Sequence, residues 1–534
     1  MASSKSTSKS LSNPAKNETK DLRKIIVASS VGSLIEWYDL FIYGSLATVL
    51  AGQFFPQSNP TAALLATLAT FAAGFIVRPF GAIVFGRLGN LTGRKYTFLL
   101  TVIIMGGSTF CLGLIPGYAQ IGFVAPSLVL LLRVLQGLAL GAEYGGAATY
   151  VAEHTPKRGF YTSWLQAMPT VGLLVSLGVI LLVRHGLDPD SARSVEKFNS
   201  WGWRIPFLLS IVLVAISVYI RLKMQESPLF QLPKGEEKLS ATAPVTVPVA
   251  APAEGVDRKT NLKLVLLALF GATMGQGVLF YTGQFYVQSF LETVCKLDFD
   301  QSKTMLLLAI LLVTPFFVLF GSWSDRIGRK WIMLSGMLLA IVTYPFLFRQ
   351  LSTISDTNGR TELTAQKEIL STVAFIAKSK DLIHTSNTIS HYEGGLTVTE
   401  TAKDTVYAAG KTPATKPLVT VSLTVSGADY WKIVGILFLL VFFVTMAYGP
   451  GGAFLADLFP RNRFTSMSLP DQIGNGIFGG MTPFIATLLT TIFTGNKLVG
   501  LWYPICIAAV CLVIGVIYIP VRPQSGKLGE KQKA

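Results

Sequence analysis

Five ionisable side chains stand inside long apolar runs in the first half of the chain: Glu36, Asp39, Arg78, Arg133 and Glu143. A charge at bilayer depth costs about 2.5 to 3.5 kcal/mol on insertion scales, so each is a candidate for proton or ion chemistry. At a rise of about 1.5 Å per residue, Asp39 and Arg133 lie roughly 16 and 10 Å from the external ends of their helices. Glu36, Arg78 and Glu143 lie deeper, at roughly 21, 24 and 25 Å.

These depths predict two layers of charge. The outer layer can pair Asp39 with Arg133, and the inner layer can place Arg78 between Glu36 and Glu143. A carboxylate shielded from water is driven toward its protonated form, and a nearby arginine drives it back. We therefore expect Glu36, Asp39 and Glu143 to carry protons and Arg133 to tune them. The alternative is a set of permanent salt bridges that only fasten the helices.

Other polar groups could bind a solute. Arg78, which precedes Pro79, could hold a carboxylate through two parallel hydrogen bonds, or could satisfy carbonyls freed by a proline kink. In the second half Gln276, Tyr281 and Tyr448 could orient a small polar solute. The alternative for each is an interhelical hydrogen bond worth about 0.6 kcal/mol. Further polar groups there are Gln284, Tyr286, Asp471, Gln472 and Asn475.

The composition requires a membrane to hold these residues. Of 534 residues, 51% are hydrophobic and only 14% are charged, against roughly 25% charged in soluble proteins. A bilayer span needs about 20 apolar residues. Such runs fall at about 25–50, 62–85, 97–116, 127–152, 161–183, 204–222, 263–291, 303–322, 331–348, 431–457, 466–494 and 498–521. We predict an all-α membrane protein with twelve transmembrane helices.

An internal repeat divides these helices into two halves. The basic turn at 86–95 returns at 321–330, an offset of 235 positions, and the segment at 152–156 returns at 456–460, an offset of 304. Repeated turns of this kind indicate two pseudo-symmetric six-helix bundles with a site between them. The offsets differ by 69, so the second half carries extra residues, which the polar stretch 351–429 accommodates.

The distribution of Lys and Arg sets the orientation. Loops on the side of the termini hold 27 of these residues and the opposite short loops hold eight, so both termini are expected in the cytoplasm. The net charge of +16 then reflects topology rather than nucleic-acid binding. The predicted parts are a tail 1–24, a bundle 25–222, a linker 223–261, a bundle 262–521 with a periplasmic insert 351–429, and a tail 522–534.

The sequence gives little support for an enzyme. The four Cys and four His residues show no metal-ligand spacing, and no nucleophile arrangement or phosphate-binding loop rises above chance. We expect no metal and no cofactor.

The repeated turn resembles the cytoplasmic signature of the major facilitator superfamily. More specific strings resemble its metabolite:proton symporter branch, which includes permeases for proline and betaine, 2-oxoglutarate, shikimate and citrate. They are Glu36-Trp37-Tyr38-Asp39, Arg78-Pro79, Gly141-Ala142-Glu143-Tyr144-Gly145-Gly146, Trp201-Gly202-Trp203-Arg204-Ile205-Pro206 and Glu226-Ser227-Pro228.

The resemblance implies alternating access by rocking of the two halves, with inward co-transport of a small organic solute and a proton. It also implies an inner gate made by Arg94, Lys95, Asp325, Arg329 and Lys330. Asn90 departs from the family pattern, in which the first turn normally has Asp, so the gate is expected to be asymmetric.

Together these features predict a monomeric, proton-coupled uptake permease of a bacterial-type inner membrane. Its partners would be the lipid bilayer, a proton and a small carboxylated or zwitterionic metabolite, with no nucleic acid. An exporter or uncoupled facilitator on the same fold is one alternative. A membrane sensor that uses the insert is another.

Overall fold

The computed structural model describes residues 14–92, 94–141, 155, 157–223, 258–358, 360–376, 381–406, 418–459 and 464–521. Glu143 lies outside these residues, as do the side chains of Asn90, Arg94 and Lys95. The expected pairing of Arg78 with Glu143 therefore falls outside the described part of the chain.

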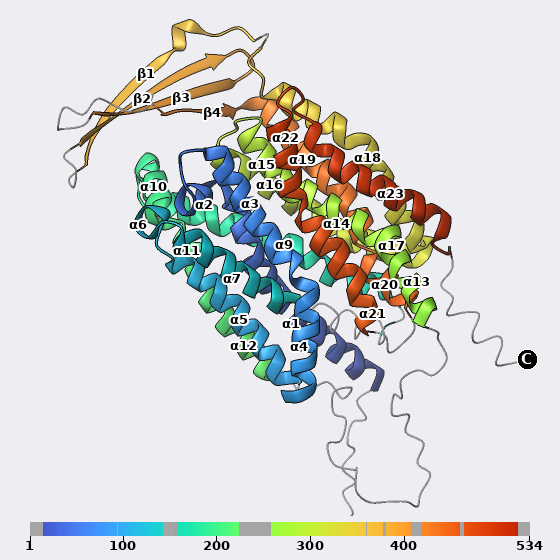
Figure 1. Cartoon of the computed structure of the whole chain (residues 1–534). Helices are drawn as coiled ribbons and strands as arrows, with labels where there is room; N and C mark the ends of the chain where they lie inside the picture. Colours follow the sequence, from blue (N-terminus) through green and yellow to red (C-terminus); the bar gives the residue numbers. More distant parts are fainter. Residues whose placement is uncertain are drawn as a thin grey trace, which may run out of the picture.

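The first half is a bundle of helices, drawn in blue to green in Figure 1. Its elements are α1 (Pro14–Ser45), α2 (Ala47–Phe54), α3 (Pro60–Ile76), α4 (Arg78–Thr92), α5 (Arg94–Leu114), α6 (Tyr118–Ile121), α7 (Val124–Gly141), α9 (Arg158–Gly186), α10 (Ser191–Lys197), η1 (Phe198–Gly202), α11 (Arg204–Leu208) and α12 (Ser210–Lys223).

The second half lies beside the first and is drawn in green-yellow to red (Figure 1). Its helical elements are α13 (Arg258–Ala268), η3 (Leu269–Thr273), α14 (Met274–Tyr281), η4 (Thr282–Tyr286), α15 (Val287–Thr293), α16 (Phe299–Val313), α17 (Pro315–Ile327), α18 (Arg329–Ile354), η5 (Thr364–Gln366), α19 (Gly427–Tyr448), α20 (Gly451–Leu458), α21 (Phe464–Asp471), η6 (Gln472–Gly479), α22 (Thr482–Ile492), η7 (Val499–Leu501) and α23 (Trp502–Tyr518).

The span count agrees with the prediction in part. Within the described residues nine helices are long and apolar enough to cross a membrane, and two bent pairs raise the number to eleven. The bends measure 65° between α1 and α2 and 51° between the segments 191–202 and 204–219. The expected run at 97–116 is a shorter apolar helix, Leu99–Leu114. Eleven spans and one shorter helix thus correspond to the twelve predicted runs.

Wide helical turns interrupt two helices that face the centre of the molecule. The π-helical segments η3 and η4 flank α14, and η6 lies in the middle of the eleventh span. Such insertions are frequent at functional sites because they redirect side chains within a helix. Around them α14 and η6 approach closely, since a Cβ on Gly277 would lie 2.7 Å from the Gly474 carbonyl oxygen. Only glycine permits that backbone contact.

The insert forms a four-stranded antiparallel sheet that projects from one end of the bundle (Figure 1). Its strands, in spatial order, are β1 (Glu368–Ile376), β2 (Asp381–Tyr392), β3 (Leu396–Val406) and β4 (Leu418–Val425). In the register Ile376 faces Asp381, Tyr392 faces Leu396 and Leu396 faces Val425. The sequence predicted an insert at 351–429 but no strands within it.

The sheet is fixed to the second half. The Asp298 amide donates to the Leu423 carbonyl and the Leu423 amide donates to the Lys296 carbonyl, both at 2.8 Å. Strand β4 therefore extends onto the loop between α15 and α16. Gln301 adds a bond in each direction to the Val425 backbone, at 2.7 and 2.9 Å. These contacts make the sheet part of the body that contains α15 and α16.

Aromatic side chains from both halves fill the centre of the bundle. Phe41 and Phe75 of the first half contact Phe285 and Tyr281 of the second, with ring centroids 4.6 and 5.2 Å apart. All four rings are buried. The hydrophobic core is thus continuous across the interface between the halves, and the polar residues described next lie within it.

Candidate functional site

Arg78 lies at the start of α4, buried between the two halves. Its guanidinium carbon is 5.4 Å from the centre of the Trp37 ring and 5.5 Å from that of Phe75. A Cβ on Gly476, in η6 of the other half, would lie 3.6 Å from Arg78 Cδ. Arg78 Nε and Nη1 are buried and have no hydrogen-bond partner among the residues that the structure describes. Such N–H groups are rare in native interiors and are suited to an incoming acceptor.

Arg133 lies on α7 and is fully buried, but it does not pair with Asp39. Its Nη1 donates to Gln136 Oε1 at 2.8 Å and to the Leu40 carbonyl at 3.4 Å. The guanidinium lies 4.6 Å from the Tyr43 ring centre and 5.1 Å from that of Phe71. Its Nε and Nη2 have no hydrogen-bond partner. The expected outer charge pair is therefore not formed in this conformation.

Asp39 faces the interior of the first half. A Cβ on Gly106 of α5 would lie 3.3 Å from Asp39 Oδ2, and Asp39 Oδ1 is buried without a hydrogen-bond partner. Among the described residues no ion pair includes Asp39. Glu36, one turn earlier on α1, is also buried. Asp39 thus has the environment expected of a group that changes its protonation state rather than of a structural salt bridge.

The second half presents amides and a phenol to the same region. Tyr281 is buried and lies within electrostatic reach of Arg78, Arg133 and Asp471. Both side-chain polar atoms of Gln472 lack partners, as does Asn475 Oδ1. Asn475 Nδ2 donates to Asp471 at 2.7 Å. From the sequence, Gln472 and Asn475 could either orient a polar solute or join helices, and neither was included in the predicted site.

Gln276 and Tyr448, which were predicted to contact the solute, make contacts between helices in the structure. Gln276 Nε2 donates to the Ala447 carbonyl at 2.7 Å, which fastens α14 to α19. The Tyr448 ring lies 5.1 Å from Phe280. Gln284 connects the halves by donating to Thr170 at 3.2 Å, and its Oε1 is buried without a partner. Gln284, which the predicted site omitted, is therefore better placed for solute binding than Gln276.

At one end of the bundle the halves are joined through Asp325. Its two carboxylate oxygens accept from the backbone N–H groups of Gly159 and Phe160, at 2.8 and 3.0 Å. These groups open α9, and the positive end of a helix dipole favours a carboxylate there. Gly159 and Gly321 face each other at this contact, where an added Cβ on either would meet the other's carbonyl oxygen. Asp325 thus caps a helix of the opposite half.

Arg329 continues this junction. It forms ion pairs with Asp457 and with Asp325, the latter at 3.5 Å, and donates to the Ala453 carbonyl at 2.7 Å. Asp457 in turn binds Arg158 of the first half at 2.7 Å. Asp457 and Arg158 were not predicted as gate residues, although Asp457 belongs to the second repeated segment.

Lys330 is placed differently from its predicted role. Its ammonium donates to the carbonyls of Val516 and Ile519, at 2.8 and 2.6 Å, at the end of α23. A cation at a helix C-terminus satisfies terminal carbonyls and the helix dipole. Both partners belong to the second half, so in this conformation Lys330 stabilises one bundle and does not bridge the two.

We expect Asp325→Asn to weaken the closure at this end. The amide removes the charge and one of the two acceptors, and hydrogen bonds to charged groups contribute about 1.5 to 3 kcal/mol, so access should rise about tenfold or more. The measurement is the rate at which a cysteine at Thr162 reacts with an impermeant maleimide in inside-out vesicles. Asp190→Asn is the matched control, because Asp190 caps α10 within its own half. Equal rates in both variants would remove Asp325 from the gate.

The described residues contain no group of three or more His, Cys, Asp or Glu side chains that could hold a metal ion. What the centre offers is a pair of arginines with unused donors, opposite amides with unused donors and acceptors, inside a ring of aromatic side chains. This arrangement can bind a small solute with an anionic group.

Comparison with known proteins identifies the family. The family described as "Sugar (and other) transporter" matches residues 24–377. The proline/betaine transporter of Salmonella typhimurium is 36% identical over 321 residues, which cover 59% of this chain and 62% of that protein, less than two thirds of its length. The alpha-ketoglutarate permease of Escherichia coli is 34% identical over 325 residues, 60% of this chain and 70% of that protein.

The fold agrees with this assignment. The structure of the xylose transporter XylE from E. coli in a partially occluded inward-open conformation superposes with a TM-score of 0.61, covering 93% of this chain and 98% of that one. At 15% identity this likeness concerns the fold alone. The chain, whose described residues include helices long and apolar enough to cross a membrane, thus belongs to the sugar (and other) transporter family of the major facilitator superfamily.

Proposed function

We propose that this protein is a proton-coupled uptake permease for a small organic carboxylate or zwitterion. The observation that carries the proposal is the set of buried, unpartnered N–H groups on Arg78, which lies between the two halves, and on Arg133, which is within electrostatic reach of Tyr281 of the second half. A carboxylate is the acceptor that a guanidinium binds best, through parallel charge-assisted hydrogen bonds.

The surroundings extend the choice of solute to zwitterions. The rings of Trp37, Phe75 and Tyr281 lie around the arginines, and aromatic faces attract ammonium groups. The unpartnered amide of Gln472 and the unpartnered side-chain oxygen of Asn475 can orient a neutral body. A solute with one carboxylate and a compact neutral or cationic part fits this chemistry. The names of the relatives, a proline/betaine transporter and an alpha-ketoglutarate permease, support the same range.

Proton coupling is assigned to Asp39, with Glu36 one turn away and Glu143 as a third candidate. Arg133 donates to the carbonyl of Leu40, the residue after Asp39, so the proton site and the solute site meet at one turn of α1. Movement of Arg133 toward a bound carboxylate would change the packing of that turn. This contact gives a short physical route by which solute and proton can influence each other.

The transport cycle would be alternating access. The Asp325 junction lies at the end of the bundle that the distribution of Lys and Arg assigns to the cytoplasm, together with both termini. Its contacts cross between the halves and can form in only some of the conformations of a rocking pair. Arg94 and Lys95 of the first repeated turn would strengthen it, and Asn90 would contribute no charge.

The test is proton movement in right-side-out vesicles that contain the protein and carry no imposed gradient. Adding proline, glycine betaine or 2-oxoglutarate outside should make the medium alkaline with at least one of them, because symport removes a proton with each solute. Vesicles with the Asp39→Asn variant are the control. Uptake of a solute without alkalinisation would show a facilitator, and acidification would show an exchanger.

A further inference from the structure

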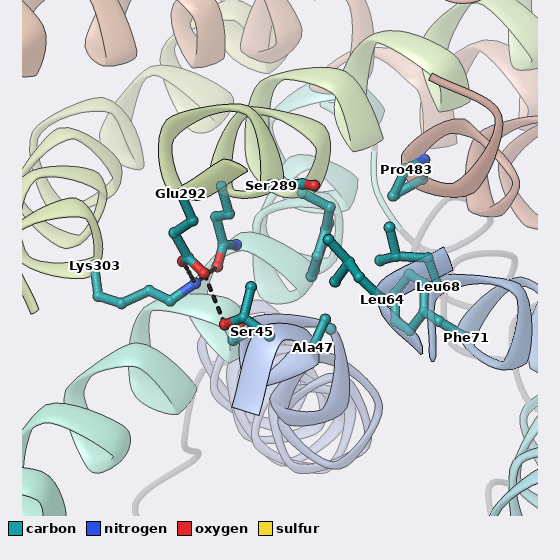
Figure 2. Close-up of a pocket in the computed structure, with 13 residues that line it drawn as sticks. Ser45, Ala47, Leu64, Leu68, Phe71, Ser289, Glu292, Lys303 and Pro483 are labelled. Carbon is teal, nitrogen blue, oxygen red and sulfur yellow. Dashed lines mark hydrogen bonds and ion pairs between the residues drawn. The ribbon is translucent and has the colours of Figure 1, made fainter. Parts of the chain in front are cut away.

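The end of the bundle opposite Asp325 holds a buried ion pair that the sequence analysis did not predict. Lys303 of α16 binds Glu292 of α15 at 2.6 Å, and their side chains are only 2% and 8% exposed. Lys303 also donates to Gln288 Oε1 at 2.6 Å. Figure 2 shows the pair at the edge of a small pocket.

The pair is held within the second half, but it fixes an acceptor for the first. Thr48 of α2 donates to Glu292 Oε2 at 2.8 Å. Lys303 binds Oε1, the other oxygen of this carboxylate, and Gln288 in turn accepts from Lys303, so Oε2 is left to receive the hydroxyl. A second contact between the halves lies nearby, where Arg184 at the end of α9 forms an ion pair with Asp300 of α16 at 2.5 Å.

Aromatic rings separate the pocket beside this contact from Arg78 and Arg133, which are together called the arginine site below. It is lined by Thr48, Glu292 and Lys303, together with Phe71 and Phe285. The centres of the two rings are 5.5 Å apart, and Phe71 also lies over the Arg133 guanidinium at 5.1 Å. Phe71 thus has the pocket on one side and the solute site on the other.

Helix α1 packs against these two rings through Gly44. A Cβ on Gly44 would lie 2.9 Å from Phe285 and 3.0 Å from Phe71. The backbone of α1 therefore packs directly against the Phe71 and Phe285 rings, one turn before the Thr48 contact. Separating the halves here would break the Thr48 bond, withdraw Gly44 from the rings and join the pocket to the solute site.

We propose that Thr48, Glu292 and Lys303 form the outer latch of the transport path, which closes the way from outside to the two arginines while the Thr48 bond is made. Glu292 and Lys303 are positioning residues, since they stay together on one body while the Thr48 bond makes and breaks. Arg184 and Asp300 form a second closing contact. The proposal rests on the proposed function in that it takes the arginine site as the destination of the solute.

Thr48→Val tests the latch by removing only the hydroxyl. In right-side-out vesicles we expect a cysteine at Ala47, which lines the pocket, to react with an impermeant maleimide about tenfold faster in this background, because bonds to charged groups are the stronger class. Thr343→Val is the matched control, since the Thr343 hydroxyl donates within α18 at an exposed position. Labelling by the native cysteines is measured in the parent chain and subtracted.

A second variant keeps the test decisive if single changes at the pair prevent folding. Glu292→Gln alone leaves the Lys303 ammonium buried without an anion, whereas Glu292→Gln with Lys303→Met removes both charges and is better tolerated. We expect this double variant to reach the membrane and to label at least as fast as Thr48→Val. Parent-like labelling in both variants, or equal acceleration by Thr343→Val, would overturn the latch.

These measurements use neither solute nor a proton gradient. If the proton-coupling proposal fails, the labelling rates of the latch variants are unaffected. If the latch variants label no faster than the parent chain, the alkalinisation of the vesicle medium is unaffected. The two proposals can therefore fail separately.

Discussion

Replacing Asp39 by asparagine should abolish uphill uptake while leaving exchange of solute across the membrane measurable. Asparagine keeps the size and polarity of the side chain but cannot bind and release a proton. The buried position of Asp39, without an ion pair in the described part of the chain, makes it the group most dependent on that exchange. If one net charge moves per cycle, 100 mV supplies about 2.3 kcal/mol, which supports roughly 50-fold accumulation. We expect the variant to lose all of it.

The measurement compares accumulation of labelled solute under a membrane potential with its exchange at equal concentrations. Asp188→Asn is the matched control. Asp188 lies in the loop after α9, where a hydrogen bond from Lys197 lowers the pKa of its carboxyl, so it stays ionised near neutral pH and carries no proton through the cycle. Preserved accumulation in Asp39→Asn would move the coupling role to Glu36 or Glu143. Loss of both accumulation and exchange would indicate a structural role.

Replacing Arg78 by lysine should lower the affinity for the solute roughly 10- to 100-fold, because each hydrogen bond to a charged group contributes about 1.5 to 3 kcal/mol. Lysine keeps the positive charge but lacks the planar pair of donors, and it cannot stack between Trp37 and Phe75 as a guanidinium does. The readout is the rise in melting temperature of purified protein with increasing solute, since a ligand that binds only the folded state stabilises it.

Arg204→Lys is the control for this prediction. Arg204 also stacks on a tryptophan, 4.3 Å from the Trp203 ring, and donates to the Ile115 carbonyl at 2.9 Å, but it lies away from the central site. Its replacement should lower the melting temperature of the free protein without changing the solute dependence. The same dependence in parent and Arg78→Lys chains would leave Arg78 with the other role considered, that of satisfying carbonyls next to Pro79.

Much of the candidate site can be predicted from single residues and their positions along the helices. A charge within an apolar run is costly whichever way its side chain points, so Asp39, Arg78 and Arg133 could be identified without knowing what they contact. The depth of each residue also follows from the rise of a helix. What depth cannot supply is rotation about the helix axis. Arg133 and Asp39 lie near the same level, yet Arg133 binds Gln136 and the Leu40 carbonyl while Asp39 faces Gly106.

Other features depended on contacts between distant segments. Glu292 and Lys303 sit near helix ends, where charges are ordinarily solvated, and only the packing of α15 and α16 against the first half buries them. Lys330 belongs to the repeated turn and was grouped with the gate, but it caps α23 instead. Gln472 and Asn475 lie in the π-helical turn of η6, which no hydrophobic pattern indicates.

The sequence by itself determined the membrane class, the repeat, the family and the concentration of buried charge in the first half, because hydrophobic content and insertion cost are properties of short segments. The tertiary structure decided which charges meet, that the insert is a sheet joined to the 296–298 loop, and that contacts between the halves lie at both ends of the bundle. These features depend on how helices rotate and pack against partners a hundred or more residues away. The cost of burying one side chain does not indicate which residue it will contact.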